Sequence, residues 1–142
     1  MKIKRALVVD SSVAVKWLNR KNEKYTKQAD KILTDVQEEK TYMIMPELAK
    51  YEIGNSLVNK QMSVRNTQNS LATYFSIPIQ FIPQDQDQAE NAAQIAHQNK
   101  ITFYDASFMA LAKEQRAILV TDNPKHQNKK VGGLKVISLK DY

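Results

Sequence analysis

The stretch that decides the fold runs from Leu7 to Leu18 and reads LVVDSSVAVKWL. Its first residues form a short apolar run, which is typical of a buried strand. The run ends at Asp10, and the two serines that follow can cap a helix, which we predict to extend to about Asn19. A buried parallel strand followed at once by a helix delivers the Asp10 carboxylate to one edge of a sheet.

The rest of the chain alternates between strand and helix patterns. We predict further strands at residues 42–45, 77–82, 117–120 and 136–139, and further helices at 23–39, 46–61, 65–75, 85–99 and 105–115. Because right-handed crossovers place helices on both faces of a sheet, this order predicts an α/β fold. We expect one three-layer α/β/α domain over residues 1–142, with a central, mostly parallel sheet of four or five strands.

Composition excludes several classes of protein. Apolar residues make up 42% of the chain and charged residues 25%, which is ordinary for a globular protein. No apolar run approaches the ~18 residues that a membrane span needs, and the run after the basic N-terminus breaks too early for a signal peptide. The chain has no cysteine, which excludes disulfides and thiolate metal sites. We therefore expect a cytoplasmic protein without a membrane partner, and its net charge of +6 favours phosphate-bearing partners.

Four acidic residues lie beside apolar segments: Asp10, Glu52, Asp105 and Asp122. Asp10 and Asp122 each follow a predicted strand, so both should lie at the carboxyl edge of the sheet, where ligands bind. Glu52 shares a helical arc with Asn55 three residues later. Each acid alone also has a structural explanation as a helix cap, a solvated helix face or a turn. Their convergence on one edge predicts an acidic pocket.

An acidic pocket of this kind suits a divalent cation. Two carboxylates ~4 Å apart repel by about 4 kcal/mol at an effective dielectric constant of about 20, so three or four would not stay ionised without a cation. Oxygen ligands favour Mg²⁺ or Mn²⁺, while His97 and His126 have no neighbour at zinc spacing. A bound cation lowers the pKa of its water and stabilises charge on a phosphate. The four acids therefore predict a metal site for phosphodiester hydrolysis by water.

Four segments carry a resemblance to a known family: VDSSV at 9–13, PEL at 46–48 with EIGNSL at 52–57, YDA at 104–106 with MALA at 109–112, and LVTD at 119–122. Over nearly its whole length the chain resembles the PIN domain, and within that family the VapC-type toxins. The resemblance implies endoribonuclease activity with Mg²⁺ or Mn²⁺ in an acidic pocket. It carries over Asp10, Glu52 and Asp105 as ligands.

The resemblance also assigns supporting polar residues, namely Ser12, Asn55 and Thr121. At the fourth acid the chain departs from the family, which commonly has Thr-x-Asp after the late strand. Here Thr121 is followed by Asp122 and then by Asn123. Either Asn123 fills the usual acidic slot, or Asp122 serves as the fourth ligand from one place early.

Basic and aromatic residues near the acids are candidates for RNA contacts. The basic candidates are Lys16, Arg20, Lys125, Lys129 and Lys130. Tyr51, Phe103 and Tyr104 could stack on bases, although core packing is the default expectation for each. The resemblance further implies a protein antitoxin and a homodimer, for which Ile53 and Leu57 are candidate interface residues.

Three alternatives compete with this interpretation, and the sequence argues against the first two. A phosphatase of the haloacid-dehalogenase type needs Asp-x-Asp after the first strand, and Ser12 occupies the second position. A response-regulator receiver needs an acidic pair near the start, where only Asp10 is present. The third alternative is a degenerate PIN fold that binds RNA or a protein without cutting, and the departure at residues 121–123 keeps it open.

Overall fold

The computed structural model describes residues 4–123, 125 and 130–142. Within these residues five strands form one sheet, and every pairing between neighbouring strands is parallel. The sheet has the order β3-β2-β1-β4-β5, and its strands are β1 (Arg5–Val9), β2 (Thr41–Pro46), β3 (Ile79–Ile82), β4 (Ile118–Thr121) and β5 (Lys135–Ser138). The predicted α/β sheet of four or five strands is confirmed.

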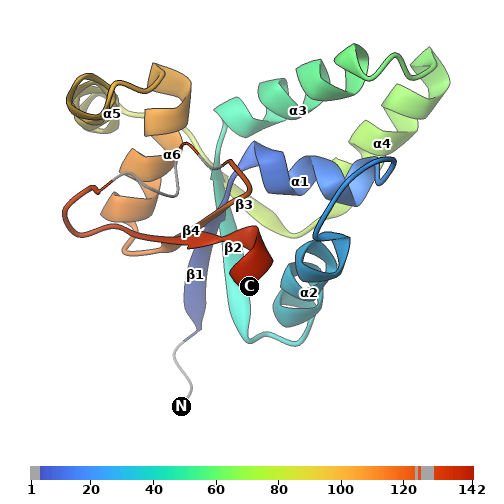
Figure 1. Cartoon of the computed structure of the whole chain (residues 1–142), viewed down its shortest axis with the longest axis horizontal. Helices are drawn as coiled ribbons and strands as arrows, with labels where there is room; N and C mark the ends of the chain where they lie inside the picture. The colour runs from blue at the N-terminus through green and yellow to red at the C-terminus, as the bar shows by residue number, and fades with distance from the viewer. Residues whose placement is uncertain (1–3, 124, 126–129) are drawn as a thin grey trace.

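Helices cover both faces of the sheet. They are α1 (Ser11–Leu18), α2 (Thr26–Gln37), α3 (Leu48–Asn59), α4 (Val64–Ser76), α5 (Gln86–Asn99) and α6 (Phe103–Glu114), and the 3₁₀ helix η1 (Leu139–Asp141) follows β5. Figure 1 shows α1 to α4 on one side of the sheet and α5 and α6 on the other, which confirms the three layers. In the part of the chain that the structure describes, no helix is long and apolar enough to cross a membrane.

The strand order creates a switch point beside β1. From β1 the chain moves to β2 and β3 on one side, and it then returns to β4 and β5 on the other. Open parallel sheets bind ligands at such a point, outside the carboxyl ends of the strands. Asp10 follows β1 and Asp122 follows β4, so the topology brings these two segments together at that edge.

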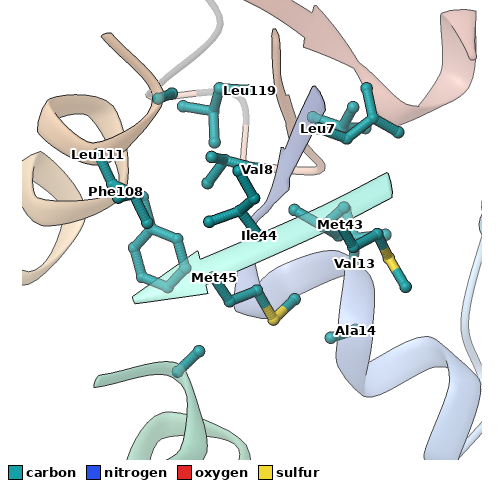
Figure 2. Packing of buried hydrophobic residues seen from close by; sticks show 14 of the residues in the cluster. Leu7, Val8, Val13, Ala14, Met43, Ile44, Met45, Phe108, Leu111 and Leu119 are labelled. Carbon is teal, nitrogen blue, oxygen red and sulfur yellow. The ribbon is translucent and has the colours of Figure 1, made fainter. Parts of the chain in front are cut away.

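The core is built on β1, β2 and α6. Residues 7–9 are fully buried, because a central parallel strand with helices on both faces exposes neither side. Helix α6 is buried from Ala106 to Ala112, as its apolar sequence predicts. In Figure 2 the ring of Phe108 lies beside β2. Burial of a side chain of this size stabilises the fold by about 1.5–3 kcal/mol.

Two helix starts differ from the prediction. Helix α1 begins at Ser11, and Asp10 rather than a serine occupies the N-cap position, without a side-chain capping bond. Helix α6 begins at Phe103 rather than at Asp105, because the hydroxyl of Thr102 caps it by accepting a hydrogen bond of 3.0 Å from the Asp105 N–H. Asp105 therefore lies in the first turn, where the helix dipole favours negative charge.

Two further boundaries have local causes. Pro46 ends β2 instead of opening α3, and the next bond to β3 is donated by the N–H of Glu47 to the carbonyl of Ile82 at 3.1 Å. Helix α2 begins at Thr26 because Tyr25 has a φ of 60°, a left-handed conformation that ends a helix.

Helix α3 presents two partly apolar faces, and the structure distinguishes them. Ile53 and Leu57 are fully buried, so the prediction that they form a dimer interface is wrong. The other face carries Tyr51 and Val58, which are 74% and 63% exposed. The face with Glu52 therefore faces the surface, where a ligand can reach it.

Candidate active site

A pocket of about 200 Å³ lies at the switch point of the sheet. The residues that line it are Asp10, Ser11, Ser12, Val15, Glu52, Ser56, Asp105 and Asn123. They come from the end of β1, from α1, α3 and α6, and from the segment after β4. Three of the four predicted acids therefore line one pocket, while Asp122 does not.

Asp10 is held by two hydroxyl groups. Its side chain is 6% exposed, and Oδ2 accepts hydrogen bonds from Ser12 Oγ at 2.9 Å and Thr121 Oγ1 at 2.8 Å. Each hydroxyl also accepts a backbone bond, from the N–H of Asp122 to Ser12 at 3.1 Å and from the N–H of Asn123 to Thr121 at 3.0 Å. This network fixes the carboxylate and ties the end of β4 to the start of α1, and buried polar groups require such partners.

Glu52 and Asp105 approach the pocket from two other helices. Glu52 is half-buried on α3, and its Oε1 accepts a hydrogen bond of 3.0 Å from Ser11 Oγ. Asp105 is half-buried in the first turn of α6. Ser11, which the sequence suggested only as a cap, therefore orients a second acid of the pocket.

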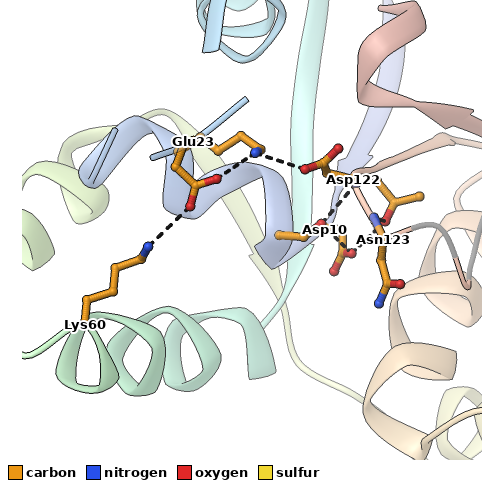
Figure 3. Close-up of polar contacts among 8 residues, drawn as sticks. Asp10, Glu23, Lys60, Asp122 and Asn123 are labelled. Carbon is orange, nitrogen blue, oxygen red and sulfur yellow. Dashed lines mark hydrogen bonds and ion pairs between the residues drawn. The ribbon is translucent and has the colours of Figure 1, made fainter. Parts of the chain in front are cut away.

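Asp122 is engaged by a buried lysine. Lys16 is 2% exposed, and its Nζ lies 2.9 Å from Asp122 Oδ2 and 2.8 Å from Glu23 Oε2. Lys60 extends the network to the other oxygen of Glu23, at 3.3 Å. Figure 3 shows this chain of ion pairs, with Asp122 at its end and Asn123 beside Asp10. Of the two candidates for the fourth slot, Asn123 is the one that lines the pocket.

The ion pairs shift the pKa values of the groups that form them. Burial alone would lower the pKa of Lys16, but hydrogen bonds to Glu23 and Asp122 raise it above its usual value. Burial would raise the pKa of Glu23, but the bonds from Lys16 and Lys60 lower it below its usual value. Both groups are therefore held in their charged forms at neutral pH.

The prediction that Lys16 contacts RNA is wrong, because a side chain that is 2% exposed and bound to two carboxylates cannot reach a phosphate. A lysine within the otherwise apolar residues 13–18 was the one signal for this role in the sequence. The sequence carried no such signal for Glu23, which lies beyond the end of α1, or for Lys60, which is far from both in the chain.

The remaining basic candidates are distributed over the surface. Arg20 forms a bidentate pair with Asp30, at 2.8 and 3.0 Å, and both side chains are about half exposed. Lys125 is exposed, and exposed Lys130 borders a separate cavity beside α5 and α6. Lys129 and His126 lie outside the described residues. The RNA contacts predicted for Arg20, Lys125 and Lys130 stay predictions.

Asn55 lines a second cavity, which adjoins the acidic pocket. This cavity measures about 360 Å³, and its walls are Leu48, Tyr51, Glu52, Asn55 and Tyr104. Glu52 lines both cavities. The predicted pairing of Glu52 with Asn55 is thus present on one helical face, although Asn55 does not line the acidic pocket.

The donor set of the acidic pocket suits a hard cation. It offers three carboxylates, and Mg²⁺ and Mn²⁺ prefer oxygen ligands. Asn123 also lines the pocket, with its amide oxygen accepting a hydrogen bond of 3.0 Å from the Lys125 N–H. Among the residues that the structure describes, however, no three His, Cys, Asp or Glu side chains stand close enough to hold a metal ion directly. The residues therefore fit a hydrated cation, which contacts part of the set through its own waters.

The sequence family of the PIN domain matches residues 7–131. The chain therefore belongs to the PIN domain family, as the sequence resemblance predicted. No curated protein matches the chain.

Its fold is similar to those of several solved structures, among them structures that contain VapC. The chain superposes on VapBC2 from Rickettsia felis, bound to a promoter DNA fragment, with a TM-score of 0.69, 14% identity and coverage of 94% of this chain and 98% of that one. It superposes on VapC20 from Mycobacterium tuberculosis, described as a toxin that cleaves the sarcin-ricin loop, with a TM-score of 0.68, 15% identity and coverage of 88% and 96%. It also superposes on PAE2754 from Pyrobaculum aerophilum, with a TM-score of 0.66, 22% identity and coverage of 96% of this chain and 90% of that one. At these identities the likeness establishes the fold.

Proposed function

We propose that the protein is an endoribonuclease that depends on Mg²⁺ or Mn²⁺ and serves as the toxin of a type II toxin–antitoxin pair. The observation that carries the proposal is the pocket at the switch point, in which Asp10, Glu52 and Asp105 meet. The PIN family is a family of nucleases, and VapC20, a structural neighbour, is described as a toxin that cleaves the sarcin-ricin loop. An acidic pocket in a chain of net charge +6 suits cleavage of a polyanion.

The residues that would hold the cation are Asp10, Glu52 and Asp105, with the side chain of Asn123 also lining the pocket. When bound, such a cation lowers the pKa of water and stabilises the charge that develops on a phosphate. The chain itself supplies orientation, since hydroxyls fix one oxygen of Asp10 and one of Glu52. Fixed groups need little reorganisation during the reaction, and this is the main source of electrostatic catalysis.

We include a protein antitoxin and a homodimer in the proposal. Several structural neighbours are VapBC assemblies, including those from Rickettsia felis and Salmonella typhimurium. An antitoxin residue such as Arg would pair with the carboxylates of the pocket as a cation does. Exposed Arg20, Lys125 and Lys130 are the proposed phosphate contacts among the described residues.

A second candidate is a PIN fold that binds RNA without cutting it. It is favoured by Asn123 at the fourth position and by the absence of a preassembled cluster among the described acids. Titration with Mn²⁺ separates the two functions, since an intact enzyme should bind Mn²⁺ and Asp10→Asn should weaken that binding.

The direct test is cleavage of a panel of structured and single-stranded RNAs by wild type and Asp10→Asn, each with Mn²⁺, Mg²⁺ or EDTA. We expect cutting by wild type that EDTA abolishes and that the variant lacks. Asp87→Asn, at an exposed position in the first turn of α5 and outside the acidic pocket, is the matched control and should cut as wild type does. Equal cutting by Asp10→Asn would show that the pocket is not the active site.

A further inference from the structure

Two tyrosines border the cavity beside the acidic pocket, and neither is required by the core. Tyr51 is 74% exposed and Tyr104 is 58% exposed. The expectation that both pack in the core is therefore wrong. Large aromatic rings that remain in solvent around one cavity are typical of a binding site.

The two rings come from different helices. Tyr51 lies on α3 directly before Glu52, and Tyr104 lies in the first turn of α6 directly before Asp105. Each tyrosine therefore adjoins, in sequence, an acid that lines the acidic pocket. The cavity between them, about 360 Å³, is within the range of small-ligand sites, roughly 300–1,000 Å³.

We propose that Tyr51 and Tyr104 form a subsite that takes an unpaired nucleobase of single-stranded RNA, next to the phosphate that is cut in the acidic pocket. The inference rests on the proposed ribonuclease function and names its substrate class. Stacking on an aromatic ring accepts any base, because every base has a π-face. A duplex keeps its bases stacked inside, so the subsite selects loops and single strands.

The lining of the cavity suits a base better than a phosphate. Among the described residues, no lysine or arginine lines it, and its polar groups are Glu52, Asn55 and the tyrosine hydroxyls. An exposed amide such as that of Asn55 can donate to and accept from the edge of a base. Because Glu52 lines both cavities, a strand with one base here has its backbone beside the acidic pocket.

A protein partner is the competing occupant, and Tyr104 distinguishes the two. Tyr51 also lines a more apolar cavity with Val58, Leu71 and Phe75, a surface that would suit a protein. Tyr104 does not line that cavity. A role in RNA binding therefore predicts equal importance of both tyrosines, whereas a protein contact predicts that Tyr51 alone matters.

The test uses the full chain with Asp10→Asn, in Mn²⁺, and a short single-stranded RNA that carries the fluorescent base 2-aminopurine. Stacking on tyrosine should quench the fluorescence, and a duplex of the same sequence should show no quenching by the protein. Tyr51→Ala and Tyr104→Ala should each lose the quenching and bind roughly 5- to 150-fold more weakly, the range for one stacked base. The corresponding Phe variants, which keep the ring, should retain both.

Tyr42→Ala is the matched control, because Tyr42 is 40% exposed at the start of β2, on the opposite edge of the sheet, and should leave binding unchanged. Unchanged quenching and affinity in Tyr104→Ala would overturn the subsite while leaving the ribonuclease function intact. Loss of dimer or antitoxin binding without loss of RNA binding would assign the tyrosines to a protein contact. Absence of RNA binding by every protein, with no cutting by wild type, would overturn the proposed function and the subsite together.

Discussion

Replacing Asp122 with Asn should destabilise the fold while leaving metal binding unchanged. The carboxylate of Asp122 lies 2.9 Å from the Nζ of Lys16, which is 2% exposed. The variant removes one of the two negative charges that surround this buried ammonium group, and Glu23 remains as the other. Asp122 does not line the acidic pocket, so the proposed cation site keeps all of its donors.

The magnitude follows from the hydrogen bond that is lost. A hydrogen bond to a charged group contributes about 1.5–3 kcal/mol. The amide oxygen of Asn can still accept from Lys16, and Asp122 is 23% exposed, so part of this contribution is retained. We expect a loss of about 1–2 kcal/mol, which lowers the melting temperature by about 3–8 °C in a chain of this length.

The assay combines thermal unfolding with Mn²⁺ titration of wild type, Asp122→Asn and Asn123→Asp. The second variant adds a carboxylate to the pocket and should bind Mn²⁺ more tightly. A carboxylate ~5 Å from a dication in a water-like dielectric strengthens the binding free energy by about 1.5–2 kcal/mol, which is a ten- to thirtyfold increase in Mn²⁺ affinity. Loss of Mn²⁺ binding in Asp122→Asn, with no gain in Asn123→Asp, would refute the assignment of the two side chains.

Three other outcomes are expected. Thr121→Val keeps the shape of a fully buried side chain but removes the hydrogen-bond donor to Asp10. In urea unfolding it should lower the free energy of unfolding by about 1–3 kcal/mol. It should also slow RNA cleavage under conditions in which the variant is still folded. Glu23 has a lowered pKa in the folded chain, so its ion pairs stabilise the fold fully at pH values above its unfolded pKa of 4.5. This contribution is lost as the pH falls through the lower pKa of the folded chain. Glu23→Gln should therefore flatten the dependence of stability on pH in that acidic range, and an unchanged slope would contradict the ion pair. Tyr142→Phe removes the hydrogen bond of 2.7 Å from the Tyr142 hydroxyl to Asp35 and should lower stability by about 1 kcal/mol without affecting cleavage.

The sequence was sufficient for the sheet and for three acids because both depend on local patterns. A run of apolar residues that ends at Asp10 can form only a buried strand with an acid at its edge, given the helix that follows. The continuous apolar residues 106–112 likewise allow only a central helix. The strand order, which brings the segments after β1 and β4 together, was established by the structure, because crossover handedness fixes the side on which a helix packs but not which strands are neighbours.

The sequence could not distinguish Asp122 from Asn123, because no periodic pattern continues past the end of a strand. Two successive side chains turn to different sides there, and which one reaches the pocket depends on the backbone bonds to Ser12 and Thr121. Helix α3 presented a similar ambiguity. Both of its faces carry apolar residues, and only packing against the sheet showed that Ile53 faces inward and Tyr51 outward.

Asp122 and Lys16 form an ion pair, and this pairing limits the negative charge that the acidic pocket can hold. A buried ammonium group needs a carboxylate partner, and Asp122 supplies it from the segment after β4. The same segment can then offer the pocket only the uncharged amide of Asn123. A dication at the proposed site would face three carboxylates rather than four, so we expect its affinity in the absence of substrate to be lower by the ten- to thirtyfold that one charge contributes. A phosphate of bound RNA would restore that charge, and metal and RNA should therefore each strengthen the binding of the other.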